Sequence, residues 1–432
     1  MLDIPAELLL MISTHMNHDD LRALAVTSQS ICRSLLPEYL RRRGLMLKDK
    51  DTCAEGPMVK LINLGGYASL GLWSVSRIFH PPEEMYCSIP CDTREARSAM
   101  EFLMHFLLHP SNSRSLRDFQ LSLQGSNPLV LTPKFAKMQS LFRTLPLTRL
   151  CFSGYGSVDC LPPSITLRSR SSCGSRTLTS LIISSDHAFA PGLVQTTMGI
   201  LRHSPIKTLT IYMVSLNPSH WSTLLGELNM ASLEDIELEG NIPRPALIRF
   251  LTKHRCLQNI CIKGNVQSDR ASSNRSRSQR ILPNLLTLHA PLAVCCDIME
   301  RVCDSSSLYE LRVEVGQLHP HHDPTFLRLV ELLRHFRRLD HLGLQLAPCS
   351  TSTVPQTIPN DSDWDRSLVR ALRQVRSLSV FRSQGPFSLG DIVRPHTLSL
   401  HISCLTHVIG HNLCLLTIIS DAGNGPCSRR WG

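Results

Sequence analysis

A short apolar phrase that recurs along the chain constrains the fold more than any other feature of the sequence. Residues 233–241 and 257–265 both read L-x-x-I-x-[L/I]-x-x-N, and they begin 24 residues apart. Looser copies begin at or near residues 116, 147, 178, 206, 285, 308, 339, 375 and 413. Because side chains in a strand alternate between two faces, each phrase predicts a short strand with one apolar face.

Helix-like runs precede several of these phrases. They are Val194–His203, Pro245–His254, Pro324–Phe336 and Trp364–Arg373. Helix followed by strand, at a period mostly in the twenties, predicts an α/β fold and resembles the leucine-rich repeat, whose template has this spacing. The resemblance implies a curved helix/strand solenoid over residues 111–421, in which each repeat contacts only its neighbours. The alternative is an ordinary βαβ domain with a doubly wound sheet.

The first fifty residues predict three short helices instead. Pro5 suits the first position of a helix, because its missing N–H would be unpaired there in any case. Asp19 or Asp20 is a candidate N-cap for the second helix, and Ser28 for the third. An apolar stripe follows the first of these starts at steps of four residues: Leu8, Ile12 and Met16. Three helices of this size bury little surface alone, so we expect them to pack against a partner or against the following domain.

This stretch resembles the F-box. Residues 4–9 read I-P-A-E-L-L, and residues 20–28 read D-L-R-A-L-A-V-T-S, close to the motif's usual Leu-Pro-x-Glu-Leu-Leu and its later Asp-Leu and Val-Ser. The polar Ser13 and Thr14 and the absence of a third-helix Trp depart from the motif. The resemblance implies a helix-to-helix interface with the small Skp-type adaptor of a cullin–RING ubiquitin ligase. The residues that would bind this adaptor are Ile4, Pro5, Leu8, Leu9, Leu21, Leu24 and Val26.

Domain boundaries follow from these two patterns. We expect an F-box helical module at residues 1–47 and a connector at 48–110, with a capping helix from Thr93 to Leu108 that Pro110 ends. The solenoid would then occupy residues 111–421, and the Gly/Ser/Arg-rich residues 422–432 would form a disordered tail. The alternative for the N-terminal helices is a structural cap on the following domain.

A solenoid of this kind would bind its protein substrate on the concave face of its sheet. The apolar residues of each phrase point into the core, so the residues between and beside them line that face. The candidate substrate-binding residues are Thr210, Tyr212, Asp235, Glu237, Glu239, Asn259, Lys263 and Arg312, with Cys261 among them. The alternative is that these polar residues simply solvate an exposed face.

Composition excludes several classes of function. The net charge of +10 is modest and spread out, and the Ser/Arg-rich segments at 168–172 and 275–280 lack the interleaved aromatics that would favour nucleic acid. The 16 cysteines contain no C-x-x-C, which suits a reducing compartment. Residues 319–323 and the pair His407/His411 are predicted not to bind metal. We expect no signal peptide and no membrane span, and therefore a cytoplasmic or nuclear protein.

No sequence motif supports catalysis by the chain itself. There is no nucleophile elbow, Walker sequence, H-E-x-x-H or dinucleotide fingerprint, so no cofactor is expected. The sequence therefore predicts a non-catalytic subunit: a substrate-recognition adaptor of an SCF-type ubiquitin ligase, which binds the Skp-type adaptor and an unknown protein substrate. The alternative is a leucine-rich-repeat scaffold whose N-terminal helices act as a cap or as a ligase-independent docking module.

Overall fold

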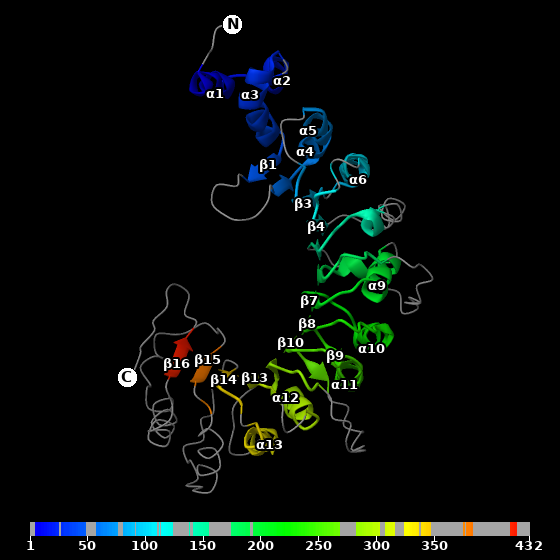
Figure 1. The fold of residues 1–432 in the computed structure, drawn as a ribbon, viewed down its shortest axis with the longest axis vertical. Helices are drawn as coiled ribbons and strands as arrows, with labels where there is room; N and C mark the ends of the chain where they lie inside the picture. The colour runs from blue at the N-terminus through cyan, green and yellow to red at the C-terminus, as the bar shows by residue number, and fades with distance from the viewer. Residues whose placement is uncertain are drawn as a thin grey trace. The chain divides into compact units, whose positions relative to one another are not determined.

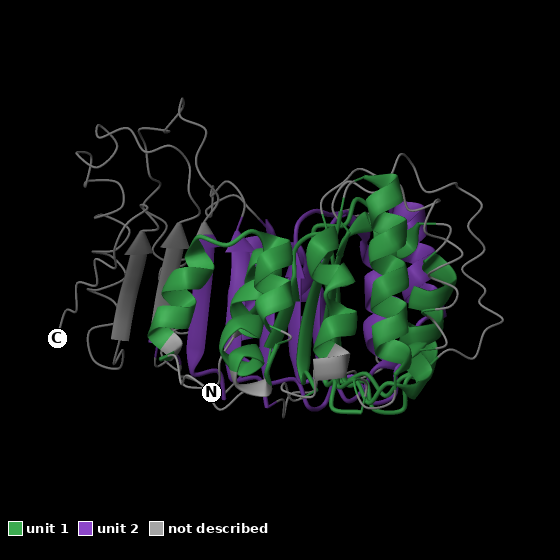
Figure 2. Ribbon diagram, turned by 90° about the horizontal axis from the view of Figure 1, so that it is seen from above, with its two compact units in different colours: residues 1–216 green, residues 217–432 purple. Residues whose placement is uncertain are grey.

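The chain folds into two compact units, Met1–Leu216 and Asn217–Gly432 (Figure 2). Each unit combines parallel strands with helices, so the predicted α/β class is confirmed. The structure, a computed structural model, describes residues 5–25, 27–48, 58–76, 81–90, 92–109, 112, 114–123, 138, 141–154, 174–190, 193–267, 282–302, 307–315, 324–336, 338–346, 375, 377–382 and 415–420.

Three helices open the first unit, as the sequence predicts. They are α1 (Ala6–Thr14), α2 (His18–Ala25) and α3 (Gln29–Arg42). Ser28 caps α3 as expected, because its side chain accepts a hydrogen bond from the amide of Ile31. The predicted cap of α2 is wrong. Asn17 accepts the hydrogen bond from the amide of Asp20 at 2.8 Å, since α2 begins earlier than expected.

The third helix holds this helical module together, because it packs on both α1 and α2. Its buried side chains are Leu35, Leu36, Tyr39 and Leu40. Arg42 adds a polar connection to α1: its guanidinium donates to the carbonyl oxygens of Ser13 at 2.8 Å and Met16 at 3.1 Å. Ser13 lies in the last turn of α1, where its carbonyl also accepts from the amide of Met16, and Met16 lies just beyond the helix, so Arg42 connects this end of α1 to α3.

A sheet follows the three helices in the first unit. Strand β1 (Leu45–Lys48) pairs antiparallel with β2 (Met58–Leu61), and every later pairing in this unit is parallel and follows chain order. The remaining strands are β3 (Glu84–Ile89), β4 (Asp118–Leu123), β5 (Arg149–Ser153), β6 (Ser180–Ser184) and β7 (Thr208–Ile211). Its further helices are α4 (Leu64–Ala68), α5 (Leu70–Ser76), α6 (Thr93–Leu108), the 3-10 turn η2 (Asp186–Phe189) and α9 (Val194–His203).

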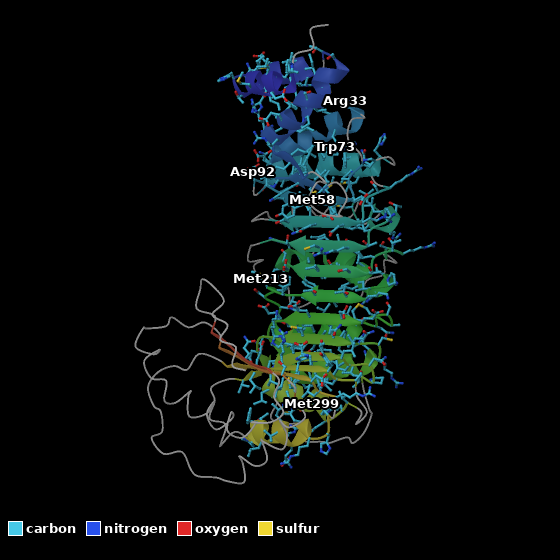
Figure 3. All side chains as sticks on the ribbon, turned by 60° about the vertical axis from the view of Figure 1, so that its left-hand side comes forward. Arg33, Met58, Trp73, Asp92, Met213 and Met299 are labelled. Atoms are coloured by element: carbon cyan, nitrogen blue, oxygen red, sulfur yellow. The ribbon has the colours of Figure 1, made fainter. Side chains whose placement is uncertain are left out.

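The segment 48–110 differs from the expected connector. Its capping helix is present as α6, but β2 and β3 also belong to the sheet, and α4 and α5 lie between them. Neither strand carries the leucine phrase. Figure 3 shows the strands of this unit in succession, with Met58 in β2, Trp73 in α5 and Asp92 at the start of α6.

The second unit repeats one pattern of parallel pairing in chain order. The strands of its main sheet are β8 (Asp235–Glu239), β10 (Asn259–Lys263), β12 (Thr287–Pro291), β13 (Glu310–Val315), β14 (His341–Leu346), β15 (Ser377–Arg382) and β16 (Leu415–Ser420). A short parallel pair is formed by β9 (Ile242–Pro243) and β11 (Val266–Gln267). The helices are α10 (Pro218–Glu227), α11 (Arg244–Lys253), α12 (Leu292–Met299) and α13 (Pro324–Leu333).

Alternation along the strands sorts apolar from polar side chains. In β8, β10 and β12 the second and fourth residues are buried and the others are half-buried, as the recurring phrase predicts. In Figure 1 the helices α10 to α13 lie along one side of the strands of the second unit, and α6 and α9 do so in the first. The core of each unit therefore lies between strands and helices, and the polar strand residues occupy the other face of the sheet.

Tight turns follow two strands of the second unit. Gly240 after β8 and Gly264 after β10 have φ values of 152° and 89°. A Cβ atom on Gly264 would lie 2.9 Å from the carbonyl oxygen of Gly240. Glycine is required there both for the backbone angle and for the close approach of consecutive turns.

Several predicted segments lie outside the described residues. They are the helix Trp364–Arg373, the Ser/Arg-rich segments 168–172 and 275–280, residues 319–323, the pair His407/His411 and the tail 422–432. Within the described ranges, no helix combines the length and the apolar character needed to cross a bilayer.

We expect Arg42→Met to loosen α1, because the carbonyls of Ser13 and Met16 would lose the side-chain donor that connects them to α3. Amide hydrogen exchange of residues 6–14 in the full chain should accelerate about tenfold, which corresponds to about 1.4 kcal/mol of local stability. Arg41→Met is the matched control: Arg41 also pairs with Glu38 but its side chain is 62% exposed, against 18% for Arg42. Equal exchange in both variants would contradict this role for Arg42.

Candidate functional site

The first helix carries apolar residues on two sides, and only one side is buried. Leu9 and Ser13 face the module's core, where α1 packs on α3. The hydroxyl of Ser13 donates to the carbonyl oxygen of Leu10 at 2.6 Å, which satisfies this polar group inside the helix. Ser13, one of the departures from the F-box pattern, is thus accommodated in the core by a local hydrogen bond.

The opposite side of α1 exposes three large apolar residues. Leu8, Met11 and Ile12 are 44%, 58% and 47% exposed. Residues three and four apart lie on one side of a helix, so these three form one surface, which we name the α1 stripe. Single exposed apolar residues are ordinary on proteins, but adjacent ones on one helix face are typical of a docking surface.

The residues predicted to bind the adaptor divide into two groups. Pro5 and Leu8 are exposed, and Leu24 is half-buried. Leu9 and Leu21 lie in the core of the helical module, where they hold the three helices together. Ile4 and Val26 lie outside the described residues. The exposed surface also includes Ile12, which belongs to the predicted apolar stripe, and Met11, which the sequence analysis did not single out.

The second candidate surface is the polar face of the sheet in the second unit, which we name the strand face. Its residues are paired across strands: Asn259 donates to Asp235 at 2.5 Å, and Thr287 donates to the amide oxygen of Asn259 at 2.7 Å. Lys263 lies 2.6 Å from the carboxylate of Glu237. Polar side chains on this face are therefore connected from strand to strand, and Lys263 and Glu237 form an ion pair.

The remaining predicted substrate residues also lie on half-exposed strand positions. The pKa of Lys263 is raised mainly by the hydrogen bond that its ammonium donates to Glu237, and the charge of Glu239, two residues further along β8, adds to this effect. Arg312 is exposed and pairs with Glu310 of its own strand at 2.6 Å. Thr210 and Tyr212, from β7 and the residues after it, belong to the first unit and are half-buried there.

A cluster that the sequence prediction did not single out joins three neighbouring strands. The sulfur of Cys261 on β10 lies 3.4 Å from Nδ1 of His289 on β12, and Nε2 of the same ring lies 3.4 Å from a carboxylate oxygen of Glu314 on β13. Cys261 and His289 are partners in the strand register. Equivalent positions in two aligned phrases could have predicted this contact.

The environment of His289 favours its charged form. The hydrogen bond with Cys261 and then that with Glu314 raise the pKa of His289 to about 9, against an opposing effect of burial. The imidazole is therefore a cation at neutral pH. Among the described residues, no group of three or more His, Cys, Asp or Glu side chains could hold a metal ion.

Neither a scan against protein-family models nor a search of curated proteins gave a match to the chain.

We expect His289 to make stability depend on pH. Its pKa is raised on folding, so its contribution is complete below its unfolded pKa of about 6.5 and is lost as pH rises through about 9. The Tm difference between wild type and His289→Gln should therefore shrink between pH 7 and pH 10. The corresponding change in the free energy of unfolding is at most about 3 kcal/mol. His335→Gln, at an exposed position after α13, is the control. A pH-independent difference would refute the assignment.

Proposed function

We propose that the chain is a substrate-recognition adaptor of an SCF-type ubiquitin ligase. In this proposal residues 1–47 are an F-box that binds a Skp-type adaptor, and residues 111–421 are a leucine-rich-repeat-like solenoid that binds a target protein. The observation that carries the proposal is the α1 stripe, because it leaves Leu8, Met11 and Ile12 exposed within the stretch that resembles the F-box.

The arrangement of the strands supports the solenoid part of the proposal. Parallel strands that pair in chain order are what stacked repeats of one unit produce, and β7, β8, β10, β12 and β13 all bury their second and fourth residues. In a doubly wound sheet the strand order would reverse at some point, whereas the described pairings of each unit run in one direction.

Such a protein would act by proximity. The helical module would hold the ligase, and the strand face would hold the substrate, so that ubiquitin transfer on other subunits gains effective concentration and orientation. The chain itself would perform no chemistry in this transfer. Function in the cytoplasm or nucleus, where such ligases work, follows from the same proposal.

A second function remains a candidate because α3 packs directly on β1. This contact suits a scaffold whose N-terminal helices cap the sheet or dock on a partner unrelated to a ligase. A cap, however, buries its apolar residues on the domain that it covers, and the α1 stripe is exposed.

Binding to a purified Skp-type adaptor separates these two functions. We expect the full chain to bind the adaptor. The double variant Leu8→Asp/Ile12→Asp should bind at least tenfold more weakly, because burying a charge in place of an apolar anchor costs more than about 1.4 kcal/mol of binding free energy. Leu10→Asp is the matched control: Leu10 is comparably exposed on α1 but lies on a different side of the helix.

Three outcomes are informative. Loss of binding in the double variant with retention in Leu10→Asp supports the proposal. No binding by the wild-type chain rejects the ligase and leaves the scaffold. Equal weakening of adaptor binding by the double variant and by Leu10→Asp would mean that the α1 stripe is not the specific contact surface.

A further inference from the structure

The cluster of Cys261, His289 and Glu314 has the arrangement of an activated nucleophile. A thiol lies against one ring nitrogen of a histidine, and a carboxylate oxygen lies 3.4 Å from the other nitrogen. The three side chains come from neighbouring strands of the main sheet, in which Cys261 and His289 are register partners. Each of the three residues is only half-buried, on the strand face.

Other described cysteines have the opposite surroundings. Cys87, Cys151, Cys295 and Cys296 are buried, and burial is the main cause that raises the pKa of each thiol. These cysteines fill the apolar core and stay protonated. Cys256, five residues before Cys261, is exposed and lies in the loop between α11 and β10. It provides an internal reference for an ordinary accessible thiol.

Charged residues lie around Cys261 on the neighbouring strands. Glu237 is its register partner on β8, and the carboxylate of Glu237 is paired with Lys263, two residues after Cys261 on β10. On the other side lies the imidazole of His289, with Glu314 next to it, and Arg312 is the register partner of His289 on β13. Glu239 and Glu310 lie on the outer strands of this group, and Glu310 is paired with Arg312. The group in direct contact with the sulfur is thus the imidazole ring, a base that can assist a thiol nucleophile.

We propose that Cys261 is a modification site, whose sulfur, assisted by the adjacent imidazole of His289, forms a mixed disulfide with low-molecular-weight disulfides such as glutathione disulfide. The thiolate attacks one sulfur of the disulfide, a new S–S bond forms, and the original S–S bond breaks. The second thiol leaves as a thiolate and takes a proton from water, so no further oxidant is needed.

The surroundings suit a disulfide that carries carboxylates. Lys263 and Arg312 flank the cluster with side chains that are 41% and 54% exposed. Both side chains can therefore donate hydrogen bonds to the carboxylates of a glutathionyl group. An adduct there would cover part of the strand face and would compete with any protein bound to it. The inference does not rest on the proposed ligase function, because the adduct forms on the isolated chain.

Mass spectrometry of the full-length reduced chain with glutathione disulfide tests the proposal. Cys256 and Cys261 share the tryptic peptide 256–263, so fragment spectra compare both thiols within one sample. We expect Cys261 to be modified at least tenfold faster than Cys256 at pH 7. In His289→Gln the rate at Cys261 should fall about tenfold while that at Cys256 stays unchanged.

The pH separates activation from mere accessibility. At pH 10 the imidazole of His289 has largely lost its proton, because its pKa is about 9, so the rates at Cys261 in wild type and in His289→Gln should converge. Glu314→Gln leaves the imidazole of His289 in the chain, so modification of Cys261 at pH 7 should proceed at an intermediate rate. This variant replaces His289→Gln in the test if His289→Gln fails to fold. His341→Gln, another histidine of the strand face, should change nothing. The proposal is overturned if Cys261 reacts no faster than Cys256, or if neither cluster variant slows it.

Discussion

The in-register pairing of parallel strands is the constraint on which the rest of the structure depends. Ile260, Leu288, Leu311 and Leu342 occupy one row across four consecutive strands of the second unit. A slip by one residue would carry such a row from the core to the opposite face, at a cost of several buried side chains. The apolar rows therefore fix the register, and the register in turn decides which polar residues become neighbours on the strand face.

Much of the fold could be predicted because burial leaves a local periodic signal. Every described strand of the main sheet from β4 onward lies on a recurring apolar phrase, and α6 and α9 have the predicted bounds. The strands β2 and β3 also alternate between buried and less buried residues, but they lack the leucine spacing, so pattern alone did not separate them from a connector. The buried side of α1 was beyond prediction for another reason: both of its sides are apolar, and only packing on α3 decides which one is core.

The candidate sites show the same limit. The contact between Asp235 and Asn259 follows from aligning two matched phrases, so the sequence contains it, whereas Lys263 is aligned with Glu239 and yet pairs with Glu237. The approach of His289 to Glu314 does not follow in this way. The direct register partner of His289 is Arg312, and Glu314 lies two residues further along, so the contact depends on side-chain rotamers.

The two surfaces differ in what they can contribute to binding. The α1 stripe is apolar, so a partner gains affinity simply by removing it from water. The strand face offers charges that already have partners, such as Lys263 with Glu237, and a bound protein must replace these pairs with equally good ones. Such exchange yields little net affinity but discriminates strongly between matching and non-matching partners. The proposed function needs this division, because an adaptor keeps one constant partner and must select among many substrates.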